Sequence, residues 1–200
     1  MSELLLKYLP EKAIPLVKEI LTEHPIFIKT VNNRRTKHGD FKRFSNGNFQ
    51  ITLNNNLNKF QFLLTLIHEI AHFITYKKYQ NSKPHGLEWK QNFQHLMLPF
   101  LQPSIFPENI LPHLANYLKN PKASTGSDVN LTYALKQYDE MSGKNFIFEL
   151  AHGSIFKFNN KNYKKGGIRR TRFECVELQS KKTYLFNKNA EVLYLKNNNE

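Results

Sequence analysis

The sequence predicts an α+β fold in two parts, and three patterns along the chain indicate it. From about Lys59 to Tyr79, apolar residues recur at helical spacing on nearly all sides, which is typical of a buried central helix. Between Phe49 and Leu53, apolar and polar residues alternate as they do in a strand. After about residue 142, aromatic and β-branched residues alternate with basic ones, which predicts three to five short antiparallel strands.

The remaining elements follow from the same rules and divide the chain into three segments. Asn46-Gly47 predicts a hairpin turn, and apolar periodicity predicts one more strand and several more helices. The strand is expected at residues 26–31, and the helices at residues 11–23, 87–97, 108–118 and 129–140. We therefore expect a mixed domain at residues 1–120, a linker with a helix at 121–142, and a basic, β-rich C-terminal subdomain at 143–200.

Composition indicates which partners and which cellular compartment to expect for the protein. The 200 residues have a net charge of +13, which favours a polyanionic partner such as nucleic acid, or else a surface charged for solubility. Cys175 is the only cysteine, so an internal disulfide is impossible and a reducing compartment fits. The apolar stretch at residues 62–74 is too short and too polar to span a bilayer, and the first fifteen residues make a poor secretion signal. We expect a cytoplasmic protein with no membrane partner.

The strongest chemical signal is the H-E-x-x-H pattern formed by residues 68–72 within the main predicted helix. His68 and His72 are four residues apart, so their imidazoles lie on one helical face and can bind one ion. Zinc suits two imidazoles and lowers the pKa of bound water to about 7. Glu69 is the expected general base for that water. The alternative is a chance match, but burying two histidines and a glutamate without a metal would be costly.

A catalytic zinc ion usually has three protein ligands, so a third is expected. The longer motif that adds a histidine after the same helix is absent, because Thr75 and Lys78 stand where its glycine and histidine would be. Glu88 on the next predicted helix is one candidate. His85 is the other, since it lies beyond a loop that can fold the chain back, and Gly86 permits a tight turn beside the metal. The residues alone leave both open.

These motifs resemble those of the SprT-like metallopeptidase family, which includes the Spartan proteases. The resemblance rests on the H-E-x-x-H motif, on His85-Gly86 with Trp89 three residues further on, and on the strand at residues 51–54. It implies a zincin-like fold, one zinc ion held by His68, His72 and His85, and catalysis by Glu69. Spartan-type members cleave proteins that are bound or crosslinked to DNA, and the basic charge agrees with that.

The C-terminal part departs from the family pattern, in which a zinc ribbon with two cysteine pairs often follows the protease. Residues 169–178 resemble a ribbon strand, but only Cys175 is present and Leu178 stands in the place of its pair mate. One cysteine cannot form a four-ligand structural site, even with His152 nearby in the sequence. We therefore predict one Zn²⁺ ion, and a C-terminal sheet in which Cys175 is a small buried residue. The expected core consists of Phe156, Phe158, Tyr163, Phe173 and Phe186.

Two groups of basic residues are candidates for sequence-non-specific DNA binding, since they could neutralise phosphates while neighbouring aromatic rings stack on bases. The alternative is that the basic residues are solvated hairpin faces and the aromatic residues belong to the core. The first group falls within twelve residues that contain no acid, and it consists of Lys161, Lys164, Lys165, Arg169, Arg170 and Arg172. The second group consists of Lys29, Arg34, Arg35, Lys37, Lys42 and Arg43.

The predicted function is that of a zinc metalloendopeptidase acting on proteins, including proteins attached to DNA. An extended substrate is expected to pair with residues 49–53 as a sheet edge. Tyr76, one turn after His72, is a conceivable oxyanion donor, although a packed tyrosine is favoured. One alternative is a DNA-binding accessory protein with a non-catalytic zinc site, which has no need of Glu69. Another is a zinc aminopeptidase that uses Glu88 as a ligand.

Overall fold

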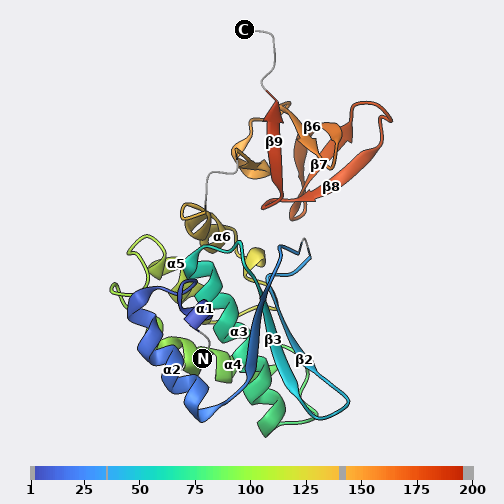
Figure 1. Cartoon of the computed structure of the whole chain (residues 1–200). Coiled ribbons are helices and arrows are strands. Elements are labelled where there is room, and N and C mark those ends of the chain that lie inside the picture. Colours follow the sequence, from blue (N-terminus) through green and yellow to red (C-terminus); the bar gives the residue numbers. More distant parts are fainter. Residues whose placement is uncertain (1–2, 35, 140–142, 196–200) are drawn as a thin grey trace. The chain divides into compact units, whose positions relative to one another are not determined.

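Figure 1 shows the structure, a computed structural model that describes residues 3–34, 36–139 and 143–195. Contacts within the chain divide it into two compact units, Met1–Asp139 and Glu140–Glu200. The predicted segments 121–142 and 143–200 extend in part beyond the described residues. Within the described residues, none of the helices combines the length and the hydropathy that a membrane span requires.

A three-stranded sheet lies on one side of the first unit. It consists of β1 (Phe27–Val31), β2 (Gly39–Arg43) and β3 (Phe49–Asn54) in the order β1-β3-β2. β3 pairs in parallel with β1 and antiparallel with β2. Gly47, in the turn between β2 and β3, has a φ of 83°, which glycine adopts without a steric penalty. The predicted strands at residues 26–31 and 49–53 and the turn at Asn46-Gly47 are confirmed.

The expectation that residues 49–53 form a sheet edge is wrong. β3 is the central strand of this sheet, because β1 pairs with one side of it and β2 with the other. β2 is the edge strand that packs against the long helix α3 (Lys59–Lys78). Alternation of apolar and polar residues marks a half-buried strand but does not give its place in the sheet, which depends on pairing with distant segments.

α3 is the central helix of the first unit, as predicted. It begins at Asn58, whose side-chain oxygen accepts hydrogen bonds from the backbone N–H groups of Phe60 (3.1 Å) and Gln61 (2.9 Å). Most of its side chains from Gln61 to Thr75 are buried. Figure 1 shows the three-stranded sheet on one side of α3 and α2 on the other. The other helices are α1 (Glu3–Leu6), α2 (Ile14–Glu23), α4 (Leu87–Met97), α5 (Leu111–Leu118) and α6 (Val129–Lys136), with short 3₁₀ turns at Glu11–Ala13, Leu98–Phe100, Thr125–Ser127 and Ile147–Glu149.

Helix α6 belongs to the first unit rather than to a separate linker segment. Leu131, Ala134 and Leu135 on α6 are buried in the same hydrophobic core as α3. Asn58, the residue that caps α3, also donates from its side-chain amide to the carbonyl of Leu135 (2.9 Å). The division between the two units therefore falls after α6, at residues 139 and 140.

The second unit is a six-stranded sheet with the order β4-β9-β5-β6-β7-β8. Three to five strands were expected, and the described residues contain six, of which β4 has only two residues. Cys175 is fully buried in its core, as predicted, and Phe158 packs against that core from a partly buried position. The other predicted core residues, Phe156, Tyr163, Phe173 and Phe186, are buried. The strands are β4 (Asn145–Phe146), β5 (Ile155–Phe158), β6 (Lys161–Arg169), β7 (Arg172–Glu177), β8 (Thr183–Asn187) and β9 (Glu191–Leu195).

Candidate metal centre

Helix α3 presents His68 and His72 on one face. Their four-residue spacing is close to one helical turn, so the two imidazoles stand one above the other. His68 is buried and His72 is half-buried, so both rings are fixed within the protein rather than extended into solvent. This is the arrangement that the H-E-x-x-H spacing predicted.

The loop between α3 and α4 brings His85 to the same place. His85 has a φ of 56°, in the left-handed region that few non-glycine residues adopt. Gly86 follows it and donates its N–H to the carbonyl of Lys83 (2.8 Å). A Cβ atom at position 86 would lie only 2.9 Å from that carbonyl oxygen, so the turn requires glycine. The sequence His85-Gly86 therefore sets the direction in which the imidazole points.

The Nε2 atoms of the three histidines converge. They lie 3.2 Å apart for His68 and His72, 2.9 Å for His72 and His85, and 3.3 Å for His68 and His85. Zinc–nitrogen bonds of 2.0–2.1 Å in a tetrahedral arrangement would separate two ligand nitrogens by about 3.3 Å. Within the described residues, these three histidines form the group whose donor atoms lie close enough together to hold a metal ion. Glu88, the alternative third ligand, is not part of that group.

The electrostatics of the cluster also fit a cation. Burial, followed by the charges of neighbouring imidazoles, lowers the pKa of His68 to about 3 and that of His72 to about 4, and burial lowers the pKa of His85. All three rings are therefore neutral at neutral pH, and each Nε2 offers either an N–H or a lone pair. Among three mutually close atoms, at least two must be of the same kind, so hydrogen bonding alone cannot satisfy every contact. Three lone pairs directed at one cation would satisfy all of them.

Glu69 lies beside this cluster, under the edge strand β2. Its side chain is 7% exposed, and the backbone N–H of Phe41 on β2 donates to its carboxylate. Burial, with a smaller effect from Asp40, raises the pKa of Glu69 to about 8. The Phe41 N–H and the positive charges of Arg34 and Lys37 act in the opposite direction. The carboxyl group is therefore poised to hold or release a proton near neutral pH.

Glu69 and His68 face the same cavity, which has a volume of about 270 Å³. Its walls come from α3, from Gly39 at the start of β2, and from Ala123 and Ser124 in the segment before α6. A molecule in this cavity can therefore meet the carboxyl group and one of the imidazoles at the same time.

Arg34 and Asn54 fix the loop that leads into β2, and the sequence analysis missed this role. Arg34 donates from Nε to the side-chain oxygen of Asn54 (2.9 Å) and from Nη1 to the hydroxyl of Thr52 (2.9 Å). The buried amide of Asn54 donates to the carbonyl of Lys37 (2.9 Å). Arg34 was grouped with the basic residues considered for DNA binding, but a polar Asn54 at the end of a buried strand is the signal that could have revealed the network.

Tyr76 packs as a structural residue. Its ring lies 5.7 Å from that of Phe49 and 6.3 Å from that of Phe41, and its hydroxyl accepts a hydrogen bond from Arg43. The favoured interpretation of a packed tyrosine agrees with these contacts.

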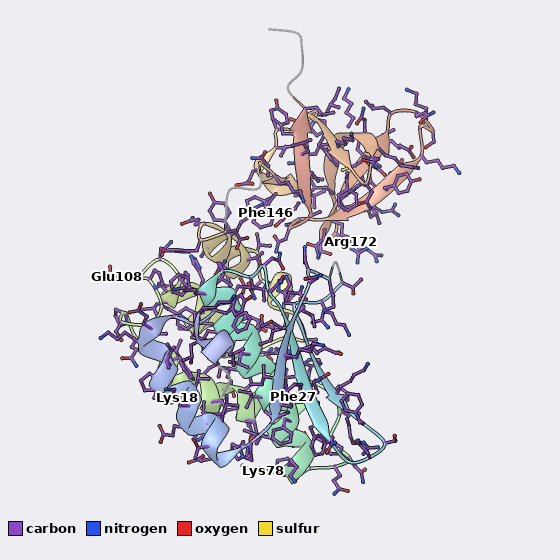
Figure 2. The ribbon with its side chains drawn as sticks, in the orientation of Figure 1. Lys18, Phe27, Lys78, Glu108, Phe146 and Arg172 are labelled. Carbon is purple, nitrogen blue, oxygen red and sulfur yellow. The ribbon has the colours of Figure 1, made fainter. Side chains whose placement is uncertain are left out.

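The basic residues of the second unit differ in exposure. Lys164, Arg170 and Arg172 are exposed, and Arg172 is labelled in Figure 2. Arg169 is exposed but pairs with Glu174 at 3.3 Å. Lys165 differs from the other residues of this group, because it is 5% exposed, its Nζ donates to the carbonyl of Leu150, and its Nζ lies 4.1 Å from the centre of the Phe173 ring.

Two further lysines of the basic groups form ion pairs with acidic residues. Lys161 pairs with Glu177 at 3.2 Å, and Lys37 pairs with Asp40 at 2.8 Å. Arg35 lies outside the described residues.

The fold and the cluster together define an α+β protein with a candidate metal centre of three imidazoles. The model of the SprT-like family matches residues 18–105, which include β1 to β3, α3 and all three histidines. The chain thus contains a SprT-like domain. No curated protein and no solved structure matches the chain.

Proposed function

We propose that the protein is a zinc-dependent metalloendopeptidase with a zincin-like active site. The observation that supports this most directly is the convergence of three neutral imidazole nitrogens beside a buried carboxyl group. His68, His72 and His85 would hold the ion, which is the set of three protein ligands that a catalytic zinc site needs. A purely structural zinc site would usually have four protein ligands and no use for Glu69.

Peptide hydrolysis needs a nucleophile, a proton acceptor and a proton donor. Zinc at such a site supplies Lewis-acid chemistry, since it makes water acidic near neutral pH and polarises a carbonyl oxygen. Glu69 takes one proton from the attacking water and returns it to the leaving amine, so its ionised and protonated forms alternate in each turnover. The Phe41 N–H orients the carboxylate between these steps.

The substrate is proposed to bind along β2 rather than β3. β2 is an edge strand, so an extended peptide could add beside it as a further strand and pair with backbone groups other than the Phe41 N–H. The Phe41 N–H on this strand already contacts Glu69, so a peptide on the same edge would lie next to the catalytic carboxyl group. This supports an endopeptidase, because an extended chain can continue past both ends of β2.

DNA is a further proposed partner, bound without sequence preference. The exposed side chains of Lys164, Arg170 and Arg172, together with the net charge of +13, support it. Proteins attached to DNA would then be the substrates.

The test compares wild-type protein with Glu69→Gln and with Glu88→Gln as a matched control. We expect one zinc ion per chain in all three, casein cleavage by wild type and Glu88→Gln, and loss of cleavage by Glu69→Gln and by chelator-treated protein. Bound zinc without cleavage of casein or histone by wild type, with or without single-stranded DNA, would favour a DNA-binding accessory protein. Cleavage by Glu69→Gln would refute the mechanism.

A further inference from the structure

Trp89 contacts all three candidate metal ligands. The centre of its ring system lies 4.6 Å from that of His68, 5.2 Å from that of His72 and 4.7 Å from that of His85. It stacks on His72 at an interplanar angle of 29° and meets the other two rings edge-on, at 61° and 74°. One indole therefore touches imidazoles that come from two different parts of the chain, the helix α3 and the loop before α4.

The indole is itself held rigidly. Trp89 is 1% exposed and lies in the first turn of α4. Its ring stacks on Phe93, one turn later, at 5.0 Å and 17°, and Phe93 is fully buried. The indole cannot shift without moving α4, so the position of the helix is transmitted to the imidazoles.

The three imidazoles contact the indole of Trp89 where metal-binding imidazoles are usually oriented by hydrogen bonds. In most metal sites, the second nitrogen of a ligating imidazole donates to a carboxylate, a carbonyl or water, which fixes the ring. Among the described residues, the side-chain hydrogen-bond contacts of His68, His72 and His85 are those between their Nε2 atoms. The surfaces that the three rings pack against therefore help to fix their orientation, and Trp89 contacts all three.

The indole of Trp89 carries a buried hydrogen-bond donor that is not satisfied among the described residues, which costs free energy. Its Nε1 is buried and has no hydrogen-bond partner within the described part of the chain. A phenylalanine would avoid this unsatisfied donor, as Phe93 does one turn later. The larger flat area of the indole is what allows it to reach three rings at once.

We propose that Trp89 is a positioning residue that holds the three imidazoles in the orientation in which their Nε2 atoms converge, so that the site is organised before a divalent cation binds. This inference rests on the metal site of the proposed function. Trp89 is also the only tryptophan in the chain, so its fluorescence reports on this site alone.

The test uses Trp89→Leu, which removes the flat ring, and Trp89→Phe, which keeps a smaller one. Phe106→Leu is the matched control, because Phe106 is fully buried in the same core and its ring contacts that of Phe60 at a tilt of 38° rather than a histidine. Zinc affinity is measured by competition with a chromophoric chelator, and stability by urea unfolding of the metal-free proteins. We expect at least a tenfold loss of zinc affinity in Trp89→Leu, and about threefold or less in Trp89→Phe and Phe106→Leu.

Two spectroscopic measurements separate positioning from general stability. Cobalt added to wild type should quench the Trp89 fluorescence and saturate at one ion per chain. The visible absorption of bound cobalt, which depends on ligand geometry, should change in Trp89→Leu and change less in Trp89→Phe, which keeps part of the flat surface. If Trp89→Leu does not fold, Trp89→Met replaces it, since methionine fills the volume without a flat ring.

Three results would overturn the proposal. The first is that Trp89→Leu binds zinc as tightly as Phe106→Leu does, at a similar loss of stability. The second is a cobalt spectrum of Trp89→Leu that is the same as that of wild type. The third is wild-type Trp89 fluorescence that bound cobalt does not quench. Failure of the peptidase proposal looks different, since zinc would then bind and depend on Trp89 while casein stayed intact. If wild type binds neither zinc nor cobalt, both proposals fall.

Discussion

Gly39 lies so close to Glu69 that any larger residue would displace the carboxyl group. A Cβ atom at position 39 would be 2.7 Å from the Oε1 atom of Glu69 and 2.7 Å from the methyl group of Thr65. The first residue of β2 thus has to be glycine for the carboxyl group to reach its present position. The edge strand β2 and the Glu69 carboxyl group are therefore in close steric contact at this position.

Gly39→Ala should therefore damage catalysis more than metal binding. The added methyl group displaces the Glu69 carboxylate, and we expect casein cleavage to fall by about a hundredfold. Overpacking should also lower the free energy of unfolding by about 1–3 kcal/mol. Zinc content should stay at one ion per chain, because the atoms nearest to the added methyl group belong to Glu69 and Thr65 rather than to a histidine. Gly167→Ala is the control, since a Cβ there meets open space. Full activity in Gly39→Ala would contradict the close fit.

The third ligand can be tested by zinc content alone. His85→Ala removes one of three converging nitrogens, so we expect the purified protein to lose stoichiometric zinc under mild dialysis. Glu88→Ala should keep one ion per chain, because Glu88 lies outside the cluster. Circular dichroism of both variants establishes that they are folded. Stoichiometric zinc in His85→Ala would show that the third ligand has been assigned wrongly.

Local patterns account for the part of the site that the sequence predicts well. The spacing of His68 and His72 is a property of one helix, and helical periodicity is encoded within a short stretch of chain. His85 is reached across a loop, so its placement was supported by the resemblance to a family rather than by periodicity.

Features that depend on distant segments of the chain could not be predicted, whereas the burial of Lys165 could have been. The central place of β3 is set by its pairing with both β1 and β2, which no local pattern contains. The burial of Lys165 had a signal that was overlooked, because residues two apart in a strand share a face and Tyr163 was already expected in the core. The contact of Gly39 with Glu69 joins two elements that are thirty residues apart in the sequence, so it required the structure.

Stability of the metal-free protein should be greatest near pH 6.5. Below that pH, imidazoles of the unfolded chain take up protons, while the folded pKa values of His68 and His72 are about 3 and 4. Acid therefore favours unfolding, by about 1.4 kcal/mol per pH unit for each such histidine. Glu69 acts in the opposite direction, because its folded pKa is about 8 and its unfolded value is 4.5. Between those values the folded state holds a proton that the unfolded chain releases, so stability falls as the pH rises.

Between pH 4.5 and 6.5, the effect of the two histidines on the free energy of unfolding exceeds that of Glu69, so stability rises with pH. From pH 6.5 to 8 only Glu69 contributes, so stability falls. Urea unfolding in the presence of a chelator at pH 5, 6.5 and 8 measures both limbs. Glu69→Gln should abolish the loss of stability between pH 6.5 and 8 and leave the acid limb in place. A wild-type protein that becomes steadily more stable up to pH 8 would contradict the assigned directions of these shifts.

Exposure should decide which basic residues contribute to nucleic-acid binding. Changing Lys164, Arg170 and Arg172 together to glutamine should weaken binding of a fluorescent oligothymidine about tenfold at 50 mM salt and reduce the salt dependence. Lys165→Met should leave binding unchanged, because the buried Lys165 ammonium group already bonds the Leu150 carbonyl. The control removes three exposed lysines from the first unit, Lys12, Lys18 and Lys119, and so changes the net charge equally. Fluorescence anisotropy distinguishes the variants, and an equal loss in the control would mean that net charge alone attracts DNA.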